Sequence, residues 1–391
     1  MRTLLFNRGA VAGFLSLFFG AAVGQPVTSD FSPQPLAEKT SDGYRVPQAE
    51  HRFEFPRDHG SHPDFKVEWW YLTGHLFGPS SERFGFQATF FRKAVPPRIP
   101  TESQSEVAFR TDEIFLFHAA LLDVATGRFV HTERLARSGW DASASEKGLS
   151  VQVGEAQLRT PDPVLERFSL DAAVGEAAGF SLQLEPSKPL VVFGKDGVSR
   201  KGDSPTAASW YLTFPRMKAV GKVRVKERLI PVEGQVWMDH EISSSQLSGE
   251  QAGWDWAGIQ FKDGREIMVY RLRQKDGKTD PASALTWVDA SGKTKYYGAS
   301  QFRWEAKGNW RSTRTVAVYP IPVLLSVPDP ETGDVVEYTL EPLVLDQELD
   351  GAVSGVPYWE GACRVLSQGK EIGSAYVELT GYAGALGKAL K

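Results

Sequence analysis

The chemically richest segment of the chain lies at residues 237–241. It reads Trp237-Met238-Asp239-His240-Glu241 and precedes a run of three serines. An acid beside a histidine, with hydroxyls nearby, is the residue set of a serine hydrolase. Neighbouring residues of a strand point to opposite faces, however, so Asp239 is not expected to orient His240, and the chain has no Gly-x-Ser-x-Gly elbow. The sequence therefore disfavours a serine triad.

A second acid lies among aromatic residues in the segment Glu68-Trp69-Trp70-Tyr71. In a strand, Glu68 and Trp70 share one face, and Trp69 and Tyr71 share the other. If the first face lines a barrel interior, Glu68 is a buried carboxyl with a raised pKa, as in a general acid. If Glu68 lies at the barrel mouth instead, an arginine pairs with it, and the sequence leaves both interpretations open.

The histidines nearer the N-terminus are weaker candidates. His59 and His62 are three residues apart and have aspartates beside them, which resembles half of a zinc site. Their segment is a loop rich in Gly and Pro, and no second cluster nearby completes the site, so we predict neither a metal nor another cofactor. His118 lies alone in the apolar run 113–123, a pattern that favours a hydrogen-bonded core histidine over a catalyst.

The elements that must position these groups are almost all short β-strands. Runs of β-branched and aromatic residues alternate with turn residues, and no long amphipathic helical pattern interrupts them. An aromatic hairpin pattern recurs, since Trp70, Gly74 and Phe77 are matched by residues of the same types 184 positions later. This offset is about the length of one β-domain, so the sequence predicts an all-β fold of two similar barrels or sandwiches, residues 48–235 and 236–391.

The N-terminus predicts export. Residues 1–8 carry two arginines and no acid, the following residues to 20 are nearly all apolar, and Ala22-Val23-Gly24 suits cleavage. The apolar run is shorter than the roughly 20 residues of a membrane span. We therefore expect a cleaved signal peptide at 1–24, no stable membrane span afterwards, and a periplasmic or secreted protein. Residues 25–47 have the composition of a disordered leader.

Composition limits the classes of function. The chain has 391 residues, 41% of them hydrophobic, and a single cysteine, so its stability must come from hydrophobic cores rather than from an internal disulfide. The formal net charge is −4, without a clustered basic excess. This charge distribution excludes a typical nucleic-acid footprint.

Several of these motifs together resemble the AttH/CrtC-type lipocalin-like family, over roughly residues 50–385. They are Arg57-Asp58-His59-Gly60, Glu68-Trp69-Trp70-Tyr71, Trp237-Met238-Asp239-His240-Glu241 and Gly253-Trp254-Asp255-Trp256. The resemblance implies two tandem lipocalin-like (calycin) barrels and an elongated apolar ligand held within or between them. The family includes carotenoid 1,2-hydratases and exported proteins described as predicted secreted hydrolases.

In the carotenoid hydratases, a His-x-Trp element and a later Tyr-x-Asp element help to protonate the alkene. The corresponding stretches here are His240-Glu241-Ile242 and Tyr270-Arg271-Leu272, which keep the His and the Tyr but lack the Trp and the Asp. This departure from the motif counts against hydratase activity; if this chain is a hydratase, another carboxyl must supply the proton. The sequence does not choose among the three candidates, which are Asp239, Asp255 and Glu68.

Acids inside aromatic walls suit alkene protonation, because a dry, neutral carboxyl supplies the proton and aromatic faces stabilise a carbocation. The predicted catalytic residues are Asp239, His240, Asp255, Tyr270 and Glu68. The predicted ligand-binding residues are Trp69, Trp70, Tyr71, His118, Trp237, Trp254 and Trp256.

The leading functional hypothesis is a protein that binds an isoprenoid or acyl-chain-like molecule and hydrates or hydrolyses it. The alternative is a non-catalytic carrier that passes such a lipid to an ABC transporter or another envelope component. A third interpretation is an assembly factor that uses the barrels as an interaction surface.

Overall fold

The structure is a computed structural model that describes residues 31–95, 112–162 and 166–384. The predicted signal peptide at 1–24 lies outside these residues. The described residues form two large antiparallel sheets and two three-residue 3₁₀ helices, η1 (Arg57–His59) and η2 (Ala299–Gln301). No helix in the described ranges is long and apolar enough to cross a membrane. The predicted all-β fold is confirmed.

The first sheet has 13 strands within the described residues, in the order β4-β3-β2-β1-β13-β12-β9-β8-β7-β6-β5, and β10 and β11 also pair with β12. Their bounds are β1 (Val67–Phe77), β2 (Arg83–Ala94), β3 (Glu113–Asp123), β4 (Arg128–Arg137), β5 (Ala142–Ala144), β6 (Ser150–Val153), β7 (Ala156–Asp162), β8 (Arg167–Val174), β9 (Ala178–Pro186), β10 (Val191–Phe193), β11 (Ser199–Arg200), β12 (Ala208–Val225) and β13 (Arg228–Ser245). The sheet curls, so that β3 contacts β6 and β8 across an apolar interior that includes Trp70, Phe90 and Phe168.

The second sheet has 10 strands within the described residues, in the order β17-β16-β15-β14-β25-β24-β22-β21-β18, with β23 paired to β24. Their bounds are β14 (Gln251–Phe261), β15 (Glu266–Gln274), β16 (Ala284–Val288), β17 (Thr294–Gly298), β18 (Arg303–Ala306), β21 (Val323–Pro328), β22 (Val335–Pro342), β23 (Glu348–Leu349), β24 (Tyr358–Ser367) and β25 (Lys370–Thr380). A separate ribbon joins β19 (Trp310–Arg311) and β20 (Val318–Tyr319). The core of the second sheet includes Trp287, Trp359 and Tyr319.

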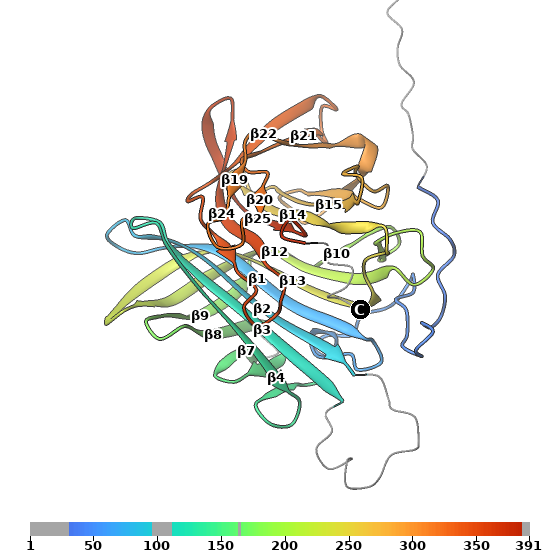
Figure 1. The fold of residues 1–391 in the computed structure, drawn as a ribbon, viewed down its shortest axis with the longest axis horizontal. Helices are drawn as coiled ribbons and strands as arrows, with labels where there is room; N and C mark the ends of the chain where they lie inside the picture. The colour runs from blue at the N-terminus through green and yellow to red at the C-terminus, as the bar shows by residue number, and fades with distance from the viewer. Residues whose placement is uncertain (1–30, 96–111, 163–165, 385–391) are drawn as a thin grey trace, which may run out of the picture.

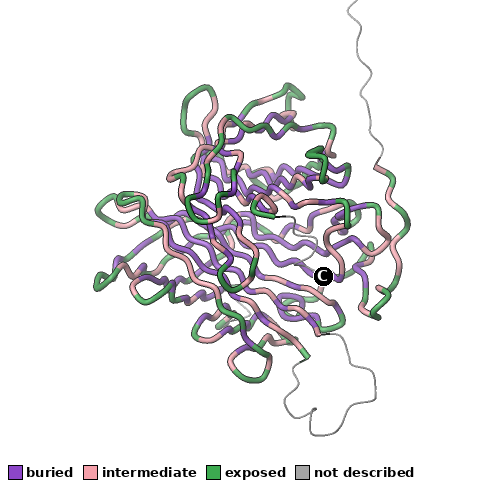
Figure 2. The backbone as a smooth tube through the Cα atoms, viewed as in Figure 1, coloured by how far each residue is buried: buried purple, intermediate pink, exposed green. Residues whose placement is uncertain are grey.

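The two sheets pack face to face, with the second above the first in Figure 1. Strand β1 contacts β25, β2 contacts β24 and β12 contacts β14. A third apolar cluster, which includes Tyr71, Trp237 and Trp256, lies between the sheets. Buried backbone runs through the centre of the molecule where the sheets meet (Figure 2). We call this space the inter-sheet region.

The two aromatic hairpins occupy corresponding places in the topology. Strand β1 pairs with β2 and with the last strand of its sheet, β13, and β14 pairs with β15 and with the last strand of its sheet, β25. The residue match at the offset of 184 does not hold in space, however. Trp70 lies in the core of the first sheet, whereas Trp254 packs against the inter-sheet cluster. A one-residue shift along a strand reverses the face of every side chain, and such a shift separates the two hairpins.

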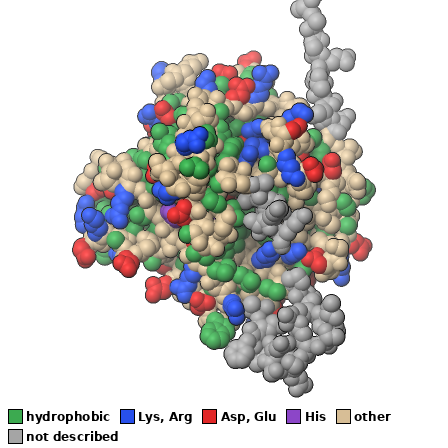
Figure 3. Space-filling view, in the orientation of Figure 1, with side chains coloured by type: hydrophobic (Ala, Val, Ile, Leu, Met, Phe, Trp, Pro, Cys, Tyr) green, Lys and Arg blue, Asp and Glu red, His purple; other side chains and the backbone are tan. Residues whose placement is uncertain are grey.

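The chain passes from the first sheet to the second between Ser245 and Gln251, whereas the sequence placed the domain boundary at 235/236, inside β13. The described part of the predicted leader, from residue 31, contacts the first sheet and its loops. Val46 is buried there, and the Ala37 amide donates to the Pro205 carbonyl. On the face drawn in Figure 3, basic and acidic side chains are interspersed.

Close contact between the sheets depends on Gly85. A Cβ atom at this position would lie 2.6 Å from the Cβ of Ala362 and 3.3 Å from the hydroxyl of Tyr376, both in the second sheet. We expect Gly85→Ala to lower the free energy of unfolding by about 1–3 kcal/mol through overpacking, measured by urea denaturation. Gly249→Ala is the control, since an added methyl there meets no atom within 4 Å. If both substitutions change the free energy of unfolding equally, the close contact of the sheets at Gly85 is not needed for stability.

Candidate active site between the two sheets

Strand β13 carries different chemistry on its two faces. Trp237 belongs to the inter-sheet cluster, whereas the next residue, Met238, belongs to the core of the first sheet. Asp239 follows Trp237 into the inter-sheet region, and His240 turns inward to bond Glu68. Asp239 and His240 have different hydrogen-bond partners, as expected for neighbouring residues that point to opposite faces of a strand.

Asp239 is a buried carboxyl whose hydrogen-bond partners among the described residues are all neutral. Oδ1 accepts from Thr213 Oγ1 at 2.5 Å and from Trp237 Nε1 at 2.8 Å, and Oδ2 accepts from Tyr211 Oη at 2.8 Å. Burial raises the pKa of Asp239 to about 7, because desolvation of the charged form outweighs these three donors, and nearby Glu241 adds to the rise. Asp239 can therefore exist as a neutral acid near neutral pH.

Aromatic rings from both sheets enclose this carboxyl. Trp256 Nε1 donates to Tyr211 Oη at 3.0 Å, which links β14 to the partner of Asp239. The Trp256 ring meets Tyr71 edge-to-face at 5.2 Å and Trp237 at 6.0 Å. Indole and phenol rings thus surround Asp239, and the faces of such rings attract positive charge.

Two further acids face each other across β24 and β25. Glu360 and Glu378 are directly opposite in the register, so their side chains are neighbours. Burial and the charge of Glu378 raise the pKa of Glu360 well above its ordinary value. Burial raises the pKa of Glu378 to about 7, against the hydrogen bond that Trp254 Nε1 donates to it at 2.9 Å. The pair therefore retains a proton near neutral pH.

His118 joins this group from β3. Its Nδ1 lies 2.8 Å from Tyr358 Oη, and the two rings stack at 5.7 Å. Burial lowers the pKa of His118 to about 4, so the imidazole is neutral. Buried polar atoms without a hydrogen-bond partner among the described residues include His118 Nε2, Thr73 Oγ1 on β1 and Tyr376 Oη on β25. The inter-sheet region therefore has polar groups able to orient a water or a ligand.

Tyr270 and Lys201 complete the site on the side of β12. Tyr270 Oη lies 3.0 Å from Ser199 Oγ. Lys201 Nζ lies 4.4 Å from the centre of the Tyr270 ring and 4.8 Å from that of Tyr211, and it pairs with Glu241 at 3.0 Å. The buried Lys201 side chain thus contacts Glu241 and both tyrosine rings.

Glu68 lies on the opposite face of β1, inside the first barrel. Its Oε1 lies 2.8 Å from His62 Nδ1 and 2.9 Å from His240 Nε2, and its Oε2 accepts from Arg92 Nε at 2.9 Å. Burial opposes ionisation, but the bonds from His240 and His62 and the charge of Arg92 hold the pKa of Glu68 well below its ordinary value. The structure combines parts of the two interpretations from sequence: Glu68 is buried in the interior, as the first had it, but it pairs with an arginine, as the second had it, and its pKa is lowered rather than raised.

Asp255 lies on the face of β14 opposite its neighbours Trp254 and Trp256, toward the core of the second sheet. It pairs with Arg271 and Arg273, each at 3.0 Å, and Tyr382 Oη donates to it at 2.9 Å. The five predicted catalytic residues are thus divided among three places. Asp239 and Tyr270 lie between the sheets, Glu68 and His240 lie in the first barrel, and Asp255 lies in the second.

The predicted ligand-binding residues are less scattered. Trp70 lies in the first core, where its ring stacks on His240 with centroids 4.8 Å apart. The other six surround the inter-sheet region: Trp69, Tyr71, His118, Trp237, Trp254 and Trp256. Sequence reasoning missed Glu360, Glu378 and Lys201. The two glutamates carry a readable signal, because each follows a tyrosine by two positions and so shares its strand face.

The fold and this site define an all-β protein of two stacked lipocalin-like sheets with buried acids between them. The chain belongs to the AttH-like family, whose model matches residues 46–382. A search of curated proteins found no match.

Three solved structures share the fold. A structure from Nitrosomonas europaea, described as an AttH, is 36% identical with a TM-score of 0.74, covering 85% of this chain and 98% of that one. Kievitone hydratase from Nectria haematococca is 14% identical with a TM-score of 0.64, covering 90% and 98%. CghA with Sch210972 is 13% identical with a TM-score of 0.52, covering 90% and 98%.

Proposed function

We propose that this protein is a hydratase that adds water to a carbon–carbon double bond of an elongated apolar ligand held between its two sheets. The observation that carries the proposal is the Asp239 carboxyl, which is 2% exposed, bonded by neutral donors and enclosed by aromatic rings. Such a carboxyl stays protonated where an exposed aspartate is ionised. It is the kind of acid that alkene protonation needs.

The reaction balances with these groups alone. The Asp239 O–H bond breaks as a C–H bond forms on the alkene, which leaves a carbocation beside a carboxylate. The rings of Trp256 and Tyr211 stabilise the cation, and the donors on Asp239 stabilise the carboxylate. A water molecule then bonds to the cationic carbon, and the proton that it releases returns to Asp239. The product is the alcohol, one water heavier than the substrate.

The remaining acids fit the role of holding that water. Glu378 is only partly buried, as are Trp254 and Trp69, so these side chains reach solvent at the edge of the inter-sheet region. Glu360 and Asp239 are fully buried. Ligand and water would enter past Glu378 and meet Asp239 deeper inside. The likeness in fold to a protein named a hydratase supports hydration over ester hydrolysis.

A carrier without catalysis is the second candidate. It is favoured by Ile242 and Leu272, which stand where the carotenoid hydratases have the Trp and the Asp of their motifs. In this case the same region would hold an isoprenoid or acyl chain for delivery to an ABC transporter or another envelope component. Both candidates place the protein in the periplasm or outside the cell, as the segment 1–24 predicts.

Native mass spectrometry and a turnover assay distinguish the candidates. The purified protein is incubated with acyclic isoprenoids and unsaturated fatty acids in water enriched in oxygen-18. Hydration predicts a product that has gained one labelled water. A ligand that is retained but unchanged across the series would reject the hydratase and support the carrier.

Trp256 should matter for retention of the ligand in either case. We expect Trp256→Ala to weaken ligand binding about 10- to 100-fold, because it removes a buried indole from the wall of the site. The measurement is the retained fraction in native mass spectrometry, with Trp140→Ala as the control, since Trp140 is 82% exposed. Equal retention in the two variants would show that the ligand binds elsewhere.

A further inference from the structure

Three ligand-type side chains meet inside the first barrel, on the face of β1 and β13 that turns away from the inter-sheet region. His62 comes from the loop after η1, Glu68 from β1 and His240 from β13. One donor atom from each lies within 4.8 Å of the others, and all three residues are buried. The sequence separates Glu68 from His240 by 172 positions, so only the pairing of β1 with β13 brings them together.

We propose that His62 Nδ1, Glu68 Oε1 and His240 Nε2 bind one divalent transition-metal ion of the zinc class. Two imidazole nitrogens and one carboxylate oxygen suit Zn²⁺, Co²⁺ or Fe²⁺, whereas Mg²⁺ and Ca²⁺ prefer oxygen ligands alone. The site is independent of the proposed hydratase, because its residues lie on the other face of the sheet.

The geometry requires only a small rearrangement. Glu68 Oε1 lies 2.8 Å from His62 Nδ1 and 2.9 Å from His240 Nε2, which are hydrogen-bond distances. Tetrahedral ligands at roughly 2.1 Å from an ion are roughly 3.4 Å apart. The ion would therefore replace the two N–H protons that point at Oε1. Each nitrogen would move about half an ångström away from Oε1, and the two nitrogens, which lie within 4.8 Å of each other, would settle roughly 3.4 Å apart.

Neighbouring groups hold two of the three ligands, His62 and Glu68, as the second layer of a metal site does, whereas His240 Nδ1 has no hydrogen-bond partner among the described residues. Asp58 Oδ1 lies 3.3 Å from His62 Nε2, the ring nitrogen that faces away from the proposed ion. Arg92 and Ser61 occupy Glu68 Oε2, which leaves Oε1 for the ion. A carboxylate behind a histidine ligand is a recurrent feature of zinc sites, because it fixes the tautomer and the ring orientation.

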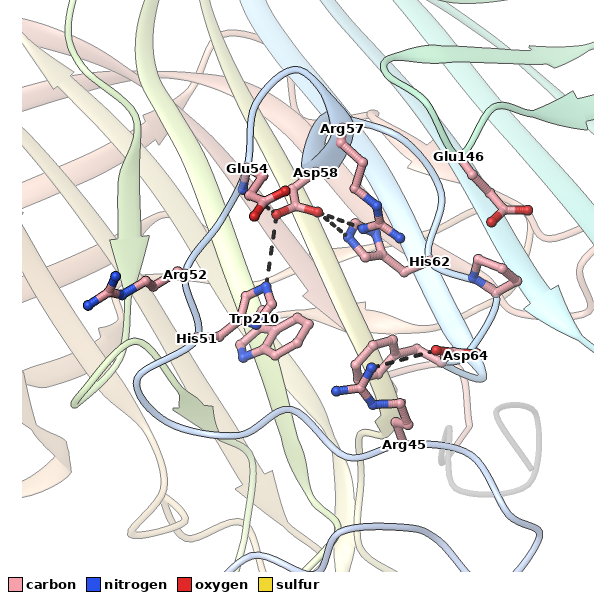
Figure 4. A pocket seen from close by; sticks show the side chains of 12 residues that line it. Arg45, His51, Arg52, Glu54, Arg57, Asp58, His62, Asp64, Glu146 and Trp210 are labelled. Carbon is pink, nitrogen blue, oxygen red and sulfur yellow. Dashed lines mark hydrogen bonds and ion pairs between the residues drawn. The ribbon is translucent and has the colours of Figure 1, made fainter.

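A cavity of about 290 Å³ lies beside the outer side of the site. His62 and Asp58 line it, and their side chains point toward each other in Figure 4. His51 and Arg57 also lie against Asp58, at 3.9 Å and 2.6 Å. In the sequence, His59 and His62 resembled half of a zinc site, although no metal was predicted. In the structure, His59 Nε2 has no hydrogen-bond partner among the described residues and is not one of the three grouped donors.

The test is a titration of the purified full chain, stripped with a chelator, with Co²⁺ and Zn²⁺ in a buffer that does not bind metal. We expect one ion per chain by calorimetry and a visible Co²⁺ absorption of the tetrahedral type. His240→Gln should weaken binding by more than about 100-fold, and Asp58→Asn by about 10- to 100-fold. His59→Gln, in the same loop, should leave the affinity within about twofold, since it removes no ligand.

Absence of binding by the wild-type chain, or an affinity unchanged in His240→Gln, would overturn the proposal. X-ray absorption of the Zn²⁺-loaded wild-type protein keeps the test decisive if His240→Gln does not fold. Two imidazole ligands are expected in the spectrum. A spectrum with one imidazole or none would overturn the proposal as well.

Discussion

Asp239→Asn is expected to lower hydration turnover by about 10²- to 10⁴-fold while ligand retention stays within a factor of a few. The amide oxygen can still accept from Thr213 and Trp237, and the amide nitrogen, which cannot accept, can donate to the Tyr211 hydroxyl, so the site keeps its shape. It cannot supply the proton. The measurement is turnover per folded molecule with a substrate found in the oxygen-18 assay, beside retention by native mass spectrometry.

The pH dependence provides a second check on Asp239. Only the protonated carboxyl is active, so turnover should fall as pH rises through about 7, the raised pKa of Asp239. The free energy of unfolding should also fall as pH rises through this range. The unfolded aspartate titrates near about 3.9, so the native state holds the extra proton between the two values. The stability contributed by protonated Asp239 is complete below the unfolded pKa and is lost as pH rises through the folded pKa.

Asp239→Asn should remove that part of the pH dependence. Asp171→Asn is the matched control, because Asp171 also lies in the first sheet and accepts a hydrogen bond, from Ser181, but is not fully buried. A variant of Asp239 that loses retention and stability together, with no separate effect on turnover, would assign Asp239 a structural role and support the carrier.

The fold was largely predictable because it depends on local patterns. Short β-rich runs separated by turns predicted the strands, and the repeated hairpin predicted the relation between β1 and β14. The error of one residue in the match of Trp70 with Trp254 arose because the side chains of a strand repeat every two residues. Composition alone does not reveal which of two adjacent tryptophan positions faces a core.

The site was less predictable because its residues are brought together by pairings distant in sequence. Asp239 could be named from its aromatic neighbours, but its partner Tyr211 depends on the register of β12 with β13. Glu360 and Glu378 depend on β24 and β25 lying opposite each other. The lowered pKa of Glu68, where a raised pKa was one expectation, has the same cause. The aromatic neighbours of this acid are visible in the sequence, but Arg92 is 24 residues away on the paired strand.

The buried ion pair of Glu68 with Arg92 gives the largest expected effect on stability. Neither side chain is exposed to solvent. Arg92 also donates to Glu113 at 2.9 Å and to the carbonyls of His62 and Phe65 at 2.8 and 2.7 Å. Arg92→Met is therefore expected to lower the free energy of unfolding by about 3–5 kcal/mol in metal-free buffer, because it leaves a carboxylate buried without its cation.

Urea denaturation of two further variants tests whether the effect comes from the buried charge. Arg134→Met removes a pair of similar length, 2.6 Å to Asp141, whose side chains are 48% and 43% exposed, and should cost much less stability than Arg92→Met, because solvent screens the pair. Adding Glu68→Gln to Arg92→Met removes the unpaired charge, so the double variant should be more stable than the sum of the single effects predicts. If the loss of stability in the double variant equals the sum of the two single losses, Arg92 acts independently of Glu68. It would then stabilise the fold through its hydrogen bonds to the carbonyls of His62 and Phe65.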